Sequence, residues 1–478
     1  QALALPLGFA LFWSDSFLPP FKHMIAQAGQ LATFRASYLL ELAGRLVNFW
    51  MLGALVVLLA LHLLLARKLR MASFALLALA AACAEPLWQH PAALPQAAGD
   101  ATLSVAGGQA ADNAAPTAAA LDAALNRFYA DESKRRVAFP AAMERKTPFD
   151  VVYLQICSLA QDDLDYAGTA GHPLWNRFNL RFSNFSTGAS YSGPAAIRLL
   201  RSGCGQPKHE DLYKPTDGAC YLFDDLKRAG FEPQWLLNHS GVFGNFIGTI
   251  QTNGGMSMPP LKFPDAAVAM RSFDDQPVQD DYDVLAHWWA QRLKDKTPQV
   301  SLFYNTVTLH DGNRLPGAPR MDPRESFAVR SKKMFDDFGR FFDLVQASGR
   351  RMVVVLVPEH GANVRGDKMQ ISGLREIPSP AIALAPVGIG LINLQPSAPL
   401  PPQLVVSDPT AHLAISHVVS QLLINSPFDN PPQDWKPYVT DLPQTNFVAE
   451  NEGMIVMRVG TRYYLRNPDT SWVEYSTQ

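Results

Sequence analysis

The chain has 478 residues, with 41 Lys or Arg against 43 Asp or Glu and a formal net charge of −2. This length exceeds one ordinary domain, and the balanced charge lacks the basic excess that nucleic-acid binding requires. We therefore expect two or three structural units and no nucleic-acid partner. Apolar residues crowd the first ninety positions, whereas the remainder has the composition of a water-soluble α/β protein.

The chain opens on Gln1 inside an apolar run, residues 2–13, which predicts a shortened membrane span with further segments upstream. A cleaved signal peptide is the alternative, but no small-residue cleavage site follows the run. Residues 24–47 place apolar side chains at helical spacing beside charged ones. This pattern is typical of an amphipathic helix in the membrane interface, or of an ordinary helix packed on the spans.

Two long apolar runs follow, 49–66 and 71–88, and His62 is the only ionisable residue of the first. Eighteen helical residues extend about 27 Å, close to the hydrocarbon thickness of a bilayer. Arg67, Lys68 and Arg70 lie between the runs, and such basic residues mark the cytoplasmic side. Residues 1–90 are therefore predicted to be transmembrane and interfacial helices, the C-terminal part of a larger membrane domain, that deliver the rest of the chain to the far side.

Residues 91–146 are predicted to be a linker and a connecting helix, because Ala, Pro, Gly, Gln and Asn dominate without apolar periodicity up to about residue 120. The segment 147–478 then alternates strand and helix patterns. This alternation predicts a mostly parallel sheet with helices on both faces, and 454–465 predicts a β-hairpin added to that sheet. Strands are expected over 151–156, 234–237, 301–308, 351–357 and 381–394, and helices over 121–136, 222–229 and 326–348.

A sharp turn leading into a helix is predicted at residues 190–201. Ser192 is a good N-cap, and Pro194 is tolerated only in the first helical turn. The free N–H groups of a helix N-terminus attract anions such as a phosphoryl group. The Ser192 hydroxyl is therefore either a cap alone or a nucleophile that faces phosphorus.

Potential metal ligands follow three of the predicted strands, at the edge where α/β sheets bind ligands. They are Cys157, His310 and the pair Glu359 and His360. A thiolate, a carboxylate and an imidazole, completed by the Ser192 oxygen, form a four-coordinate site of the kind that zinc prefers. Each residue also has an ordinary explanation: a buried thiol, an exposed loop side chain, or a hydrogen-bonded core histidine.

Cys204 and Cys220 flank a polar loop, and in an extracytoplasmic domain this spacing indicates a disulfide. Two free thiols, or a bond from one of them to Cys157, are the alternatives. We prefer the Cys204–Cys220 bond, which leaves Cys157 free for metal; Cys83 lies in a predicted span.

Four segments carry a family resemblance: ICSL at 156–159, a run with SYSGP and CGQ at 187–206, FYN to LHDGN at 303–313, and VPEHG at 357–361. They resemble the alkaline phosphatase superfamily in its membrane-anchored phosphoethanolamine transferase branch. Within that branch they are similar to the cellulose phosphoethanolamine transferase family, the G subunits of bacterial cellulose secretion systems. The likeness runs over essentially the whole chain.

The resemblance implies an alkaline-phosphatase-like α/β/α sandwich with Ser192 as nucleophile. It also implies one zinc ion on Cys157, Ser192, Glu359 and His360, catalysis assisted by His310, and substrate contacts from Tyr191 and Arg375. Relatives that modify lipid A use a Glu, a Thr nucleophile and several disulfides, so Cys157, Ser192 and one disulfide fit the cellulose-directed branch better.

The implied reaction moves phosphoethanolamine from phosphatidylethanolamine to the 6-hydroxyl of glucosyl units in nascent cellulose, through a phosphoethanolamine-serine. The implied partners are the cellulose synthase subunits, and the implied place is the bacterial inner membrane with the catalytic domain in the periplasm. A lipid A-type acceptor, a lipid phosphodiesterase or phosphohydrolase, and a non-catalytic scaffold are the alternatives. A sulfatase is disfavoured because Ala196 stands where that family needs Arg.

Overall fold

The computed structural model describes residues 39–40, 49–65, 116–142, 145–319, 321–395 and 400–476. The chain divides into two compact units, Ala36–Asp112 and the remainder formed by Gln1–Arg35 with Asn113–Gln478. The apolar runs 2–13 and 71–88, most of the segment 24–47 and most of the linker lie outside the described residues. The domain boundaries expected near 90 and 146 stay a prediction.

Helix α4 (Phe49–Leu65) matches the expected apolar helix over 49–66 and contains no charged residue. Within the described ranges, no helix combines the length and the apolar character needed to cross a membrane. The membrane crossing therefore stays a prediction.

A seven-stranded sheet forms the centre of the larger unit, in the order β3-β6-β1-β7-β8-β2-β9. All neighbours pair in parallel except those of β8, which runs antiparallel to β7 and to β2. The expected mostly parallel sheet is thus confirmed. Its strands are β1 (Asp150–Ile156), β2 (Leu180–Ser186), β3 (Glu232–Leu237), β6 (Val300–Thr306), β7 (Met352–Pro358), β8 (Leu384–Ile392) and β9 (Leu404–Val406).

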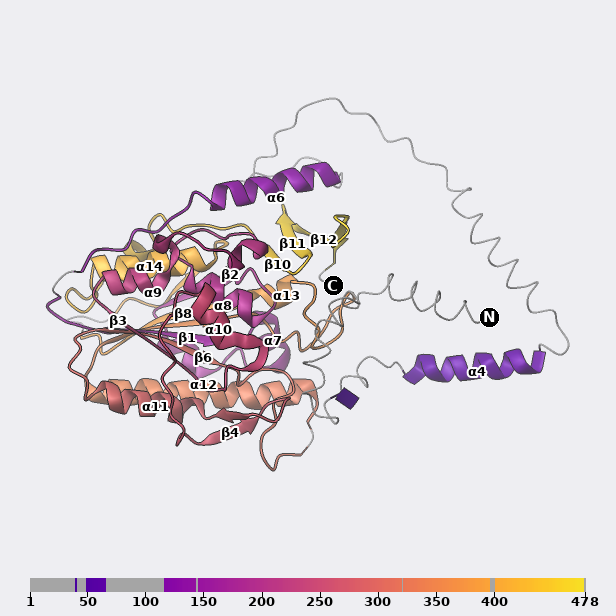
Figure 1. Cartoon of the computed structure of the whole chain (residues 1–478), viewed down its shortest axis with the longest axis horizontal. Helices are drawn as coiled ribbons and strands as arrows, with labels where there is room; N and C mark the ends of the chain where they lie inside the picture. The colour runs from indigo at the N-terminus through magenta and orange to yellow at the C-terminus, as the bar shows by residue number, and fades with distance from the viewer. Residues whose placement is uncertain are drawn as a thin grey trace, which may run out of the picture. The chain divides into compact units, whose positions relative to one another are not determined.

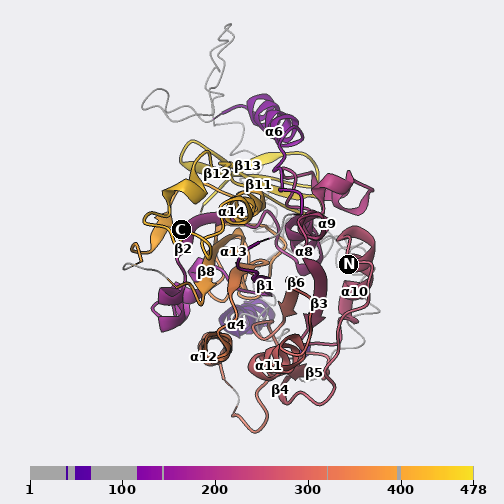
Figure 2. The same cartoon turned by 90° about the vertical axis from the view of Figure 1, so that its left-hand side faces the viewer.

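Helices cover both faces of this sheet, as Figures 1 and 2 show for α9 and α14 on one side and α11 and α12 on the other. Strand residues alternate between the faces: Val151 and Tyr153 of β1 pack into one core, and Val152 and Leu154 into the other. The helices are α7 (Gln161–Ala167), α8 (Ser192–Leu200), α9 (Leu222–Arg228), α10 (Phe246–Asn253), α11 (Asp281–Arg292), α12 (Pro323–Ser348) and α14 (His412–Ile424).

The C-terminal strands form a sheet of their own, so the expectation that they extend the main sheet is wrong. β10 (Val448–Asn451), β11 (Met454–Val459), β12 (Arg462–Arg466) and β13 (Trp472–Tyr475) pair antiparallel in sequence order. The hairpin itself is confirmed by the β11–β12 pairing. One face of this sheet packs against Ile377 and Ala383, and the other packs against α6 (Ala118–Glu132). Its apolar residues are therefore buried without contact with the strands of the main sheet being needed.

Several boundaries differ by a few residues from the sequence prediction, and two of them have consequences for the elements themselves. The expected strand 381–394 begins as a short helix, α13 (Pro380–Ala383), because Pro380 favours the first turn of a helix. The expected helix 121–136 ends at Glu132. The remaining elements are β4 (Val268–Arg271), β5 (Pro277–Gln279), and the 3₁₀ helices η1 (Pro173–Arg177), η2 (His209–Tyr213), η3 (Gly218–Cys220), η4 (Phe243–Asn245) and η5 (Lys436–Val439).

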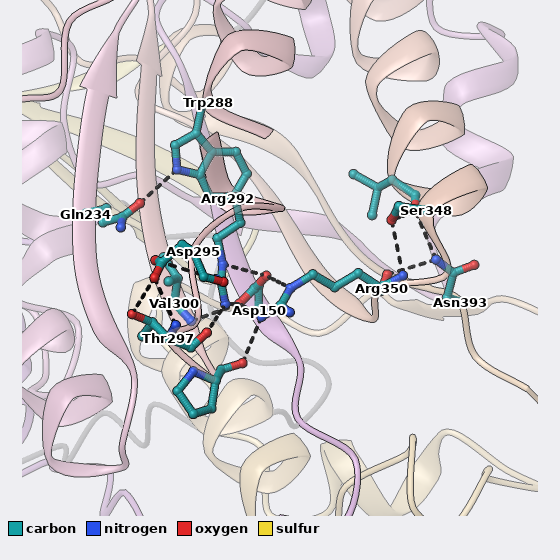
Figure 3. A network of polar contacts seen from close by, with 12 residues as sticks. Asp150, Gln234, Trp288, Arg292, Asp295, Thr297, Val300, Ser348, Arg350 and Asn393 are labelled. Carbon is teal, nitrogen blue, oxygen red and sulfur yellow. Dashed lines mark hydrogen bonds and ion pairs between the residues drawn. The ribbon is translucent and has the colours of Figure 1, made fainter. Parts of the chain in front are cut away.

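A buried ion cluster around Asp150 holds the amino end of β1 (Figure 3). The Asp150 carboxylate is fully buried and accepts hydrogen bonds from the guanidinium groups of Arg292 and Arg350 and from the Val300 N–H. These contacts tie β1 to β6, α11 and the segment before β7. The residues expected to form the site follow the opposite, carboxyl end of β1.

Candidate metal centre

Cys157, Glu359 and His360 follow directly after β1 and β7. Because these strands are parallel neighbours, with Ile156 opposite Pro358, the residues after them meet at one edge. The Cys157 Sγ lies 3.9 Å from His360 Nε2, which lies 3.8 Å from Glu359 Oε2. One ligand atom from each residue falls within 4.8 Å of the others, and all three residues are buried. The structure therefore brings together the three predicted protein ligands.

Ser192 joins this cluster from the N-terminus of α8. Its Oγ lies 3.4 Å from Cys157 Sγ and 3.3 Å from His360 Nε2. The prediction that Ser192 is the N-cap is wrong, because Tyr191 has the extended cap conformation and Ser192 is the first helical residue. The hydroxyl therefore does not cap the helix, and it points at the cluster instead.

The His360 ring is fixed with its Nε2 toward the cluster. Its Nδ1–H donates to the carbonyl of Gly361 at 2.8 Å, which leaves the Nε2 lone pair available. Gly361 passes close to Ala160, where an added Cβ would lie 2.6 Å from the Ala160 side chain. Asp163 also accepts the N–H groups of Ala362 and Val364, so the loop after β7 is held against the segment after β1.

The electrostatics of the cluster favour a bound cation. Burial, reinforced by the charge of Glu359, raises the pKa of the Cys157 thiol to about 12. Burial also raises the pKa of Glu359, and burial followed by the charge of Arg375 lowers the pKa of His360 well below its usual value. Two acidic groups thus lie beside a neutral imidazole, and Glu359 Oε2 accepts no hydrogen bond from the described residues. This donor set fits a divalent metal of the borderline-soft type.

Arg375 and Tyr191 lie beside the cluster, as predicted. The Arg375 guanidinium donates to Ser158 Oγ at 3.0 Å and lies over the Tyr191 ring, 5.4 Å from its centroid. The Tyr191 hydroxyl donates to Glu376 at 2.7 Å. Ser158 has a left-handed backbone with φ of 66°, a strained conformation next to Cys157. No role was predicted for Ser158, although it lies within the ICSL motif, and Glu376 lies in none of the motifs.

His310 follows β6 but makes no hydrogen bond to the cluster within the described residues. Its ring packs on Phe273, with centroids 4.8 Å apart, and its Nδ1–H donates to the Asp311 carbonyl at 2.8 Å. Burial, with the charge of Arg375, lowers its pKa to about 4. The imidazole is therefore neutral at physiological pH, with Nε2 unprotonated. Its catalytic role stays a prediction.

The structure contains the Cys204–Cys220 disulfide, which confirms the preferred pairing. It joins the segment after α8 to η3. Among the described residues Cys157 is the free cysteine, and it is buried.

Fold and site together define the class: an α/β domain with a buried candidate metal centre beside a serine at a helix N-terminus. Residues 1–84 match the family model of the cellulose biosynthesis protein BcsG N-terminal domain, and residues 105–472 match that of the BcsG C-terminal domain. The chain therefore belongs to the BcsG family of cellulose biosynthesis proteins.

Three known proteins illustrate the likeness. The cellulose biosynthesis protein BcsG of Escherichia coli is 39% identical over 99% of this chain and 87% of its own length. A Vibrio parahaemolyticus protein of the alkaline phosphatase superfamily is 16% identical, with a TM-score of 0.48, over 73% of this chain and 86% of its own. The C-terminal periplasmic domain of E. coli EptC, in complex with zinc, is 15% identical, with a TM-score of 0.44, over 66% of this chain and 94% of its own.

Proposed function

We propose that the chain is a zinc-dependent transferase that moves phosphoethanolamine from phosphatidylethanolamine to the 6-hydroxyl of glucosyl units in nascent cellulose. The observation that carries this proposal is the Ser192 hydroxyl, which lies at a helix N-terminus within 3.4 Å of both Cys157 and His360. Membership of a cellulose biosynthesis family supports the acceptor. The sequence motifs that resemble phosphoethanolamine transferases support the transferred group.

Cys157, Glu359 and His360, together with the Ser192 oxygen, would hold one zinc ion. The thiol, carboxylate and imidazole match the ligands that zinc accepts. When bound, zinc supplies a Lewis acid that lowers the pKa of a neighbouring hydroxyl and offsets developing negative charge. The Cys157 thiol and the Glu359 carboxylate are both fully buried.

In the first step, the Ser192 oxygen attacks the phosphorus of the lipid, the bond from phosphorus to the diacylglycerol oxygen breaks, and diacylglycerol leaves with the serine proton. The product is phosphoethanolamine esterified to Ser192. The backbone N–H groups at the start of α8 face the same place and stabilise charge on the phosphoryl oxygens. Arg375, which lies over Tyr191, adds a second source of positive charge there.

In the second step, a glucosyl 6-hydroxyl attacks the same phosphorus and the bond to Ser192 Oγ breaks. His310 is the candidate base for this hydroxyl, because its Nδ1–H donates to the Asp311 carbonyl, which leaves the Nε2 lone pair free to accept a proton. The serine oxygen recovers a proton, and the acceptor retains phosphoethanolamine. Water must be the poorer acceptor, since hydrolysis would waste the lipid donor.

We place this reaction in the periplasm, at the bacterial inner membrane beside the cellulose synthase subunits. The disulfide supports an oxidising compartment, because such bonds persist outside the cytoplasm. A lipid A-type acceptor, a phosphodiesterase or phosphohydrolase, and a scaffold remain the competing functions. A hydrolase with two metals is disfavoured, because the described residues bring together one such group of ligands.

Intact-mass measurement tests the proposal. The full chain is incubated with a short-chain phosphatidylethanolamine, with and without a cello-oligosaccharide, beside Ser192→Ala and a chelated sample. We expect a phosphoethanolamine adduct on Ser192 that the sugar discharges and that both controls lack. Release of headgroup without an adduct, equal in wild type and variant, would move the assignment to a hydrolase or scaffold.

A further inference from the structure

The Glu359 carboxylate is held asymmetrically. Its Oε1 accepts a hydrogen bond of 2.6 Å from the Asn305 side-chain amide. Its Oε2 lies on the side of His360 Nε2 and accepts no hydrogen bond from the described part of the chain. One oxygen is thus anchored, and the other is presented to the cluster.

Asn305 supplies this anchor from the carboxyl end of β6, where it is buried. Its Nδ2 also contacts Gln155 Oε1 at 3.2 Å on the adjacent strand β1. Its Oδ1 lies 3.0 Å from His239 Nε2. A carboxylate only accepts hydrogen bonds, so the NH₂ of Asn305 must face Glu359 and its oxygen must face His239.

His239 fixes this orientation from the segment after β3. The Gly241 N–H donates to His239 Nδ1 at 3.1 Å, so the ring proton lies on Nε2 and is donated to Asn305. The ring packs against Phe246, with centroids 5.6 Å apart. Desolvation lowers the pKa of His239 to about 4, so the imidazole is a neutral donor at physiological pH.

We propose that His239 and Asn305 are positioning residues, which form a hydrogen-bond chain from the Gly241 backbone to Glu359 and aim the free carboxylate oxygen at the metal. The inference rests on the proposed role of Glu359 as a metal ligand. Every donor in the chain is neutral, so the chain orients the carboxylate without placing a competing positive charge beside it. An Arg or Lys at position 305 would orient Glu359 but compete with the metal.

Co²⁺ titrated into the metal-free full chain tests this inference, because cobalt bound by a thiolate has visible and charge-transfer absorption. Wild type is compared with Asn305→Ala, and with the pair His239→Gln and His239→Phe. Outer-shell partners of metal ligands typically contribute 10- to 100-fold to affinity. We expect Asn305→Ala and His239→Phe to bind Co²⁺ roughly 10- to 100-fold more weakly, with altered visible bands. His239→Gln, whose amide can donate in place of Nε2–H, should remain near wild type.

Asn393→Ala is the matched control. The Asn393 amide donates to the Val345 and Arg350 carbonyls at the far end of the sheet (Figure 3), so the variant loses comparable hydrogen bonds without touching Glu359. Its cobalt affinity and spectrum should equal those of wild type. Absence of cobalt binding in wild type would refute the proposed metal centre itself. If wild type and Asn305→Ala bind cobalt with equal affinity, the positioning role is overturned and the metal centre stands. If Asn305→Ala does not fold, equal affinity in wild type and His239→Phe has the same meaning.

Discussion

The Ser192 hydroxyl lies 3.4 Å from the Cys157 thiol, although the two residues are 35 positions apart and belong to different elements. Cys157 follows the central strand β1, and Ser192 begins helix α8. A hydroxyl that points at a buried thiol from a helix N-terminus has little to contribute to stability there. Its position fits the nucleophile proposed above.

Replacing Ser192 with Ala should therefore abolish the phosphoethanolamine adduct and lower the transfer rate by about 10³-fold or more, because loss of a nucleophile removes the covalent route. The free energy of unfolding should change by less than about 1 kcal/mol, since the hydroxyl caps no N–H group. Ser190→Ala, in the same turn, is the control: its buried Oγ has no partner among the described residues, and activity should persist. An adduct that still forms in Ser192→Ala would contradict the assignment.

Metal removal should destabilise the chain. A ligand that binds only the folded state adds about 4 kcal/mol when its concentration is about 1,000 times its Kd. Adding zinc to chelated protein should raise the melting temperature of wild type, with one zinc per chain by elemental analysis, and should not do so for Cys157→Ala. Magnesium should give no such shift, because it avoids thiolate ligands. Equal zinc content in wild type and Cys157→Ala would exclude the thiol as a ligand.

Arg375→Lys should lower the rate about tenfold or more. The planar guanidinium lies over Tyr191 while it donates to Ser158, and a flexible ammonium cannot reproduce both contacts. Rates measured over a range of lipid concentrations would separate kcat from KM. Arg365→Lys is the comparison, because Arg365 is exposed and pairs with Asp162. A rate for Arg375→Lys within twofold of wild type would remove Arg375 from the site.

Acid should destabilise the fold through buried histidines outside the site. Burial, with the charge of Arg198, lowers the pKa of His412 to about 3. Between about pH 6.5 and 3 the unfolded chain therefore binds a proton that the folded chain does not, so stability falls as the pH falls through this window. His412→Phe, which keeps the edge-on contact with Phe185, should reduce the slope by up to about 1.4 kcal/mol per pH unit. Denaturant unfolding at several pH values measures it, and an unchanged slope would refute it.

Asp150→Ala should cost about 3 to 5 kcal/mol of folding free energy, because it removes the buried carboxylate that pairs with Arg292 and leaves this guanidinium only its longer ion pair with Asp295 (Figure 3). Asp343→Ala, which breaks an exposed pair with Arg177, should cost less than about 1 kcal/mol. Urea unfolding compares the two. Similar losses in both variants would show that the Asp150 cluster contributes no more than a surface pair.

The sequence predicted the part of the site that depends on strand order. Cys157 and Glu359 each follow a strongly apolar run, and ligands at the carboxyl ends of parallel neighbours must meet, so their proximity follows from local patterns. The roles of Asn305 and His239 were not predicted, because the residues they contact are brought together only by the tertiary structure. The polar Asn305 in a largely apolar strand was nevertheless a signal that could have been used. The separate C-terminal sheet was not predicted, because the sequence pattern of a hairpin does not indicate which sheet the hairpin joins.

Two cysteines of the catalytic domain are oxidised to a disulfide, and a third is a free thiol. Cys204 and Cys220 must be oxidised, and their bond closes a loop whose Gln206 side chain donates to Val448 of the C-terminal sheet. Cys157 must stay reduced if it is to bind metal, and in the proposed periplasmic location it would meet the same oxidants. Its complete burial withholds it from them once the fold has closed. In the proposed periplasmic setting, a chain that exposed Cys157 while disulfides formed would be open to the wrong pairing, so we expect burial of Cys157 to precede oxidation of the other two thiols.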